Sequence, residues 1–119
     1  MEISRFDDIW LGFFAEKILH TMGGTVAYGT PLSTHARNTH NLERELEHEA
    51  IGIRLNEVLV DVLDSIDISG DSYNECFRDL ISKFRKQLDG NTDYTFEAYF
   101  KKMLDGMEVW ADACDQVLG

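Results

Sequence analysis

The sequence predicts an all-α fold: a four-helix bundle or an irregular four-helix domain with a long loop between helices 1 and 2. Three observations support this prediction. Apolar residues recur at helical spacing in four separate stretches. The chain contains a single proline, and it lies between the first two stretches. Short connections join the last three stretches, which favours antiparallel neighbours. With 119 residues, the chain is expected to form one domain over residues 1–119.

The first helix is predicted over residues 4–22. Ser4 can cap its start, and two aspartates in the first turn suit the positive end of the helix dipole. Gly23 and Gly24 are expected to end it, because glycine accepts the left-handed conformation common after a helix. Its apolar face is expected to contain Phe6, Ile9, Trp10, Phe13, Ile18 and Met22, widened by Phe14 and Leu19.

Residues 25–39 are predicted to form the long loop. This segment contains Gly29 and Pro31 and has no acidic residue. Loops of this length are uncommon in compact domains and are often functional or mobile.

The second helix is predicted over residues 41–66. Its second half carries a dense apolar stripe, whereas Leu42 and Leu46 are the large apolar residues of its first half. The first half is therefore expected to project from the body or to frame the preceding loop. The stripe consists of Ile51, Leu55, Val58, Leu59, Val62, Leu63 and Ile66.

Two further helices complete the prediction. Ser72 followed by Glu75 forms a capping box for the third, which ends at about residue 88. The fourth begins at Asp93 or Thr95 and runs to about residue 118. The apolar face of the third contains Tyr73, Cys76, Phe77, Leu80, Ile81, Phe84 and Leu88. The face of the fourth contains Phe96, Tyr99, Phe100, Met103, Leu104, Met107, Trp110, Ala111, Cys114 and Leu118.

Composition narrows the classes of function. The formal net charge is −11, which argues against direct binding to nucleic acid and against adsorption to anionic membranes. No apolar run is long enough for a transmembrane helix, and the N-terminus lacks the pattern of a signal peptide. Cys76 and Cys114 are expected to be buried free thiols, with a disulfide as the alternative. These features favour a cytoplasmic protein.

Acidic residues concentrate in one segment of the chain. Residues 41–71 contain nine acidic and two basic side chains. Like charges one helical turn apart repel each other, so this segment costs helix stability and suggests docking to a basic partner. The predicted partner-binding residues are Glu43, Glu45, Glu47, Glu49, Glu57, Asp61 and Asp64.

The sequence-based hypothesis is therefore a small acidic inhibitor without enzymatic activity or cofactor. It would bind a basic partner, such as a nuclease toxin or a nucleic-acid-handling defence complex, and cover the surface that binds nucleic acid. Immunity proteins and phage anti-defence proteins provide the analogy, which is one of size and charge.

Two alternatives remain open from the sequence. The side chains of His40, Glu43, Glu45 and His48 have i,i+3 spacings that suit a metal-binding enzyme or sensor. The excess of large apolar side chains would also suit a structural homodimer.

Overall fold

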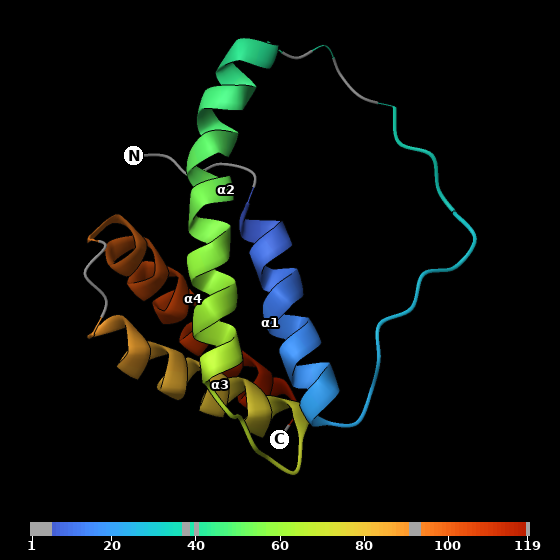
Figure 1. The fold of residues 1–119 in the computed structure, drawn as a ribbon. Helices are drawn as coiled ribbons and strands as arrows, with labels where there is room; N and C mark the ends of the chain where they lie inside the picture. The colour runs from blue at the N-terminus through green and yellow to red at the C-terminus, as the bar shows by residue number, and fades with distance from the viewer. Residues whose placement is uncertain (1–5, 37–38, 40, 91–93, 119) are drawn as a thin grey trace.

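The computed structural model describes residues 6–36, 39, 41–90 and 94–118, and this part of the chain contains four α-helices and no strand (Figure 1). The predicted all-α class is confirmed. The helices are α1 (Asp7–Thr21), α2 (Leu42–Ser65), α3 (Tyr73–Leu88) and α4 (Tyr94–Leu118).

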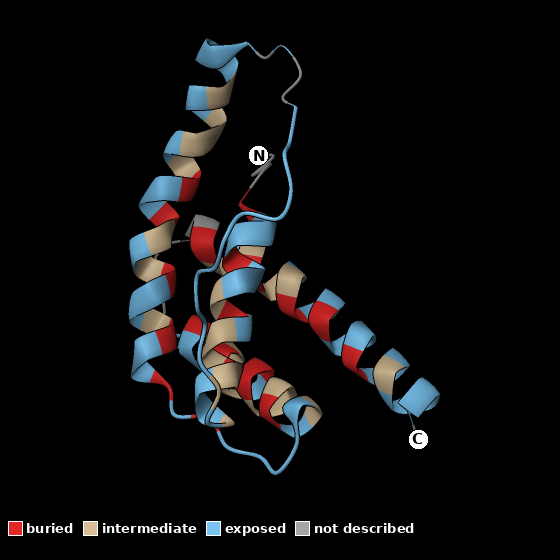
Figure 2. Ribbon diagram, turned by 90° about the vertical axis from the view of Figure 1, so that its right-hand side faces the viewer, coloured by how far each residue is buried: buried red, intermediate tan, exposed pale blue. Residues whose placement is uncertain are grey.

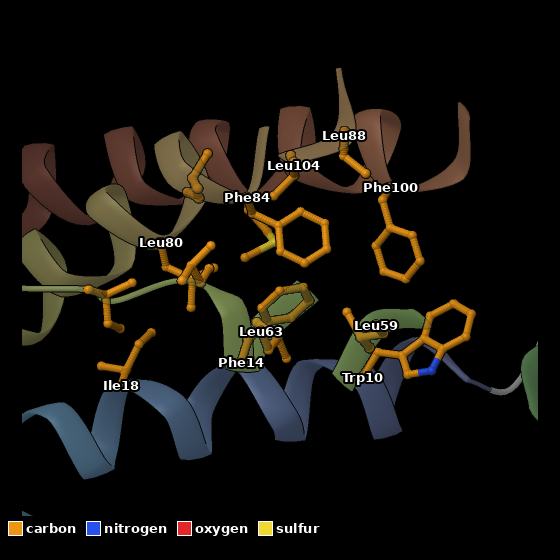
Figure 3. Packing of buried hydrophobic residues seen from close by; sticks show 14 of the residues in the cluster. Trp10, Phe14, Ile18, Leu59, Leu63, Leu80, Phe84, Leu88, Phe100 and Leu104 are labelled. Atoms are coloured by element: carbon orange, nitrogen blue, oxygen red, sulfur yellow. The ribbon is translucent and has the colours of Figure 1, made fainter. Parts of the chain in front are cut away.

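The helices form two layers that enclose one apolar core. α1 and α2 lie side by side, and α3 and α4 run across them in the second layer (Figure 1). Leucine and aromatic side chains from the two layers meet between them (Figure 3). The arrangement corresponds to the irregular four-helix domain, the second form that the sequence predicts.

Aromatic rings make up the centre of this core. The ring of Trp10 on α1 lies 5.0 Å from that of Phe100 on α4, and the ring of Phe14 lies 5.4 Å from that of Phe84 on α3. These centroid distances are in the range that favours tilted and edge-to-face pairs. Trp10 is fully buried, and its Nε1 donates a hydrogen bond of 2.8 Å to Oδ1 of Asn56 on α2. The one polar atom of the buried indole therefore has a hydrogen-bond partner.

Local sequence signals explain where α2 and α3 begin. The side chain of Asn41 caps α2 by accepting hydrogen bonds from the backbone N–H groups of Glu43 and Arg44, at 3.1 and 3.2 Å. Ser72 caps α3 by accepting from Glu75 N, at 3.2 Å, as the capping box predicts. The predicted caps Ser4 and Asp93 lie outside the described residues.

The predicted apolar faces need correction at helix surfaces. Ile9 on α1 is 46% exposed, and Trp110 and Leu118 on α4 are 66% and 81% exposed. Cys76 is buried, whereas Cys114 is only partly buried, and both thiols are free. The reason for the exposure on α4 is that its last turns are covered on one side, where Ala111 is buried and Asp112 and Asp115 pair with Arg78 on α3 (Figure 2), so the apolar periodicity continues where packing does not.

The first turns of α2 project beyond α1, as predicted (Figure 1). Leu42 and Leu46 are exposed there, and burial begins at Gly52, where a Cβ atom would lie 2.2 Å from the ring of Phe6. The segment 25–36 is an exposed, irregular connection that carries the accessible side chains of Tyr28 and Leu32. Among the described residues, no helix has the length and apolar character needed to cross a bilayer.

Candidate functional site

The structure places the seven predicted partner-binding acids along α2. Five of them are exposed, and Glu45 and Glu49 are partly buried. Glu57, Asp61 and Asp64 lie in the half of α2 that packs on the body, whereas the other four lie in the projecting half. The acids are therefore spread along the helix and do not converge on one point. The exposed members are Glu43, Glu47, Glu57, Asp61 and Asp64.

The proposed metal ligands do not form a recognisable centre in the described part of the chain. His40 lies outside the described residues. Among the residues that are described, no group of three or more His, Cys, Asp or Glu side chains is arranged to hold a metal ion. Glu43, Glu45 and His48 follow one another along the exposed start of α2.

The acids of α4 serve the fold itself. Arg85 on α3 contacts Asp105 at 2.9 Å and Glu108 at 3.0 Å. Arg78, on the same face but nearer the start of α3, contacts Asp112 at 2.8 Å and also Asp115. Because α3 supplies both arginines and α4 all four acids, these ion pairs join the two helices.

A second polar cluster holds the α2–α3 turn. Oδ2 of Asp79 accepts hydrogen bonds from Lys83 Nζ, at 2.7 Å, and from the backbone N–H of Ser69, at 2.8 Å. The hydrogen bond from Lys83, together with that from Ser69, lowers the pKa of Asp79 although partial burial opposes the shift. Next to this turn, burial and the neighbouring carboxylates raise the pKa of Cys76, which makes a thiolate unfavourable there.

A cleft with chemically varied side chains lies between α1 and α2. We call it the α1–α2 cleft; it has a volume of about 300 Å³. α1 contributes a carboxylate, an imidazole and an ammonium group, with His20 Nε2 at 3.7 Å from Glu16 Oε1, and α2 contributes a second carboxylate. The lining residues are Phe13, Glu16, Lys17, His20, Val60, Leu63 and Asp64.

This combination suits a polar ligand with an apolar face. Carboxylates accept hydrogen bonds from hydroxyl groups, and the ammonium of Lys17 attracts phosphate. The ring of Phe13 supplies an apolar wall. Sequence reasoning identified Asp64 but missed the α1 side of the cleft. The missed signal was Glu16, Lys17 and His20 within one turn of an otherwise apolar helix.

Comparison with known proteins defines the class. A family model for reversibly glycosylated polypeptides matches residues 1–118 of this chain. The chain belongs to the reversibly glycosylated polypeptide family. No solved structure matches it.

The relatives with names are mutases. The chain is 28% identical to probable UDP-arabinopyranose mutase 1 of Pisum sativum, over 97% of this chain and 30% of that protein. It is 25% identical to UDP-arabinopyranose mutase 1 of Arabidopsis thaliana, over 97% of this chain and 31% of that protein. It is 28% identical to UDP-arabinopyranose mutase 1 of Oryza sativa subsp. japonica, over 97% of this chain and 30% of that protein. The chain thus spans under a third of the length of the curated relatives it matches.

These findings overturn the sequence-based hypothesis of function. The predictions of an inhibitor, an immunity or anti-defence protein and a nuclease partner are wrong, because the family is one of reversibly glycosylated polypeptides. The prediction of a protein without enzymatic activity is also wrong, because the relatives are named as mutases. The physical reason is that acidic helices are not specific for nucleic-acid mimicry. Whether the seven acids of α2 contact a partner stays a prediction.

Proposed function

We propose that this chain is a helical unit that serves a UDP-arabinopyranose mutase-type reaction together with the rest of such an enzyme. The observation that carries the proposal is the family match over residues 1–118, which covers all four helices. The names of the relatives support UDP-arabinopyranose as the substrate and an intramolecular rearrangement as the reaction.

The size of the unit explains why it would act together with further polypeptide. The α1–α2 cleft, at about 300 Å³, is at the lower end of the range for ligand sites, and it is open to solvent. A nucleotide sugar buries most of its surface when bound, so a second wall is needed. In the relatives, the matched segment is only about 30% of the protein, and the remaining polypeptide can supply that wall.

A segment-exchange experiment tests this function. The matched segment of the Pisum sativum relative is replaced by this chain, and the resulting chimera is incubated with UDP-arabinopyranose. Chromatographic separation of the isomeric UDP-sugars measures conversion. The proposal predicts that the chimera converts the substrate, whereas a control with a flexible Gly/Ser linker in place of the segment does not. A folded chimera without activity would contradict it.

The α1–α2 cleft is the part of this unit that we propose contacts the UDP-sugar. Lys17 would attract the diphosphate, while Glu16 and Asp64 would accept hydrogen bonds from sugar hydroxyls. In the chimera, Lys17→Ala is expected to raise KM about tenfold with kcat little changed, because it removes binding common to ground and transition states. Lys86→Ala, an exposed lysine on α3, is the matched control. Equal KM values for both variants would contradict the proposal that the cleft contacts the UDP-sugar.

A further inference from the structure

An apolar groove lies between α1, the start of α3 and the end of α4, on another part of the surface from the α1–α2 cleft. Its volume is about 500 Å³. We call it the α1–α3–α4 groove. Its lining side chains are mostly apolar: Ala15, Ile18, Leu19, Tyr73, Asn74, Phe77, Trp110, Cys114 and Leu118.

The most exposed wall of the groove is the last part of α4. Trp110, Cys114 and Leu118 are four residues apart, so they share one helix face. Trp110 is 66% exposed and Leu118 is 81% exposed, although the preceding turns of the same helix bury Phe100 and Leu104 completely. Contiguous apolar surface of this kind marks interaction sites, and tryptophan is the residue most enriched among binding hot spots.

The polar groups beside the groove already have partners. Arg78 pairs with Asp112 and Asp115, and Asn74 Nδ2 donates a hydrogen bond to Asp115. An apolar segment could therefore cover the groove without leaving these groups unsatisfied, which would otherwise cost free energy. The groove favours an apolar occupant, because its lining is mostly apolar and the nearby acids Asp112 and Asp115 already share Arg78.

We propose that the α1–α3–α4 groove is the docking surface for the remaining polypeptide of a UDP-arabinopyranose mutase-type protein. This inference rests on the proposed function. Most of the length of each relative lies outside the segment that matches this chain, and in them it is covalently attached to that segment. Asp112 and Asp115 join the end of α4 to Arg78 on α3, but the side chains of Trp110 and Leu118 stay exposed among the described residues, so further polypeptide has room to cover them.

A second copy of this chain is the less suitable occupant. Each copy carries a formal charge of −11, so bringing two together adds repulsion that an apolar groove of this size must overcome. A homodimer that buries Trp110 is therefore an outcome that would overturn the proposal. Sedimentation equilibrium of the purified chain detects it, and a monomer is expected.

The decisive test uses the chimera described above. Hydroxyl-radical footprinting, read by peptide mass spectrometry, reports the reactivity of each tryptophan separately. In the chain alone, Trp110 is expected to react readily and Trp10, which is fully buried, to react slowly. In the chimera, the reactivity of Trp110 is expected to fall to the level of Trp10. If Trp110 stays as reactive as in the chain alone, the docking surface is wrong, whether or not the chimera converts UDP-arabinopyranose.

The converse result separates the two proposals. A chimera that protects Trp110 but shows no conversion supports the docking surface and contradicts the function. A chimera that converts substrate with Trp110 still reactive supports the function and contradicts the docking surface.

A second measurement tests the docking surface if the chimera fails to fold. The chain is co-expressed with the Pisum sativum relative from which the matched segment is deleted, and co-purification is measured. Trp110→Ser is expected to lower the recovered complex at least about tenfold, because a hot-spot tryptophan contributes that much or more. Val109→Ser is the matched control, since Val109 is exposed on the same turn but does not line the groove. Absence of co-purification, or equal loss with both variants, would overturn the proposal.

Discussion

The two longest helices, α2 and α4, are both acidic but differ in what their acids do. They contain 24 and 25 residues, and each carries acidic side chains along its outer face. The acids of α4 pair with Arg78 and Arg85 and so fix α4 to α3. In contrast, Glu57, Asp61 and Asp64 on α2 face solvent and form no ion pair with another described residue. Charge along a sequence therefore does not distinguish a structural role from a binding role.

The helices also differ in where they are buried. α4 buries its first half and exposes its end, whereas α2 exposes its start and buries its second half (Figure 2). The buried halves build the core, and the exposed halves extend beyond it in different places. Four experiments can break or sharpen this comparison.

The largest effect is expected from the buried half of α4. Phe100 is fully buried and contacts the rings of Trp10, Phe84 and Phe96. Phe100→Ala should lower the free energy of unfolding by about 3–5 kcal/mol, since it removes apolar contacts and leaves a cavity. Leu46→Ala, on the projecting start of α2, should change it by less than about 0.5 kcal/mol. Urea denaturation measures both, and similar losses would contradict the assignment of the core.

Replacing glycine by alanine should change the stability of the protein in opposite directions in the two helices. A Cβ at Gly52 on α2 would lie 2.2 Å from the ring of Phe6, so Gly52→Ala is expected to destabilise by about 1–3 kcal/mol through overpacking. A Cβ at Gly106 on α4 meets no atom within 4 Å, so Gly106→Ala should stabilise by about 0.5–1 kcal/mol through helix propensity. Thermal unfolding monitored by circular dichroism gives both signs. A stabilising Gly52→Ala would show that α1 and α2 are further apart than described.

Removal of one α3–α4 ion pair should have a smaller effect. Arg85 contacts both Asp105 and Glu108, and these acids are largely exposed. Arg85→Ala is expected to cost about 0.2–1 kcal/mol at low salt, and the cost should shrink as ionic strength rises. Lys86→Ala is the control. A loss that does not depend on salt would mean that Arg85 acts through packing of its aliphatic stem.

The pH dependence of the α2–α3 turn should give the smallest effect. The hydrogen bond from Lys83 holds the pKa of Asp79 below its usual value of about 3.9, so the ionised carboxyl stabilises the fold above that pH. This contribution is lost as pH falls through the lowered pKa of the folded state. Asp79→Asn should therefore be less stable than the unmodified protein at neutral pH, with the difference vanishing in acid. A difference that persists unchanged in acid would exclude this linkage.

The sequence predicts the parts of the fold that helix periodicity and capping residues define. The repeat from Tyr73 to Leu88 and the capping residue Ser72 define α3 closely, because amphipathic spacing and caps are local signals. Periodicity could not predict that Trp110 is exposed, since exposure depends on which side of α4 the other helices cover. It also could not predict that Arg78 and Arg85 would occupy the acids of α4, because those contacts bridge 20 residues or more of sequence.

The candidate site was predicted less well than the fold. The acidic start of α2 is recognisable from the sequence because its charges are close together along the chain. The α1–α2 cleft joins Lys17 and His20 to Asp64, residues that only tertiary packing brings together. Family membership rests on the match of the family model to residues 1–118, and no short motif in the sequence names the chemistry.

Conversion of UDP-arabinopyranose by the chimera tests the central claim most directly, namely that this chain is a helical unit of a mutase-type enzyme. The measured quantity is the rate at which the isomeric UDP-sugar forms, compared with the Pisum sativum relative under the same conditions. The account predicts conversion within about tenfold of the rate of that relative, the loss expected when distant contacts shift slightly. A folded chimera as inactive as the linker control would contradict it.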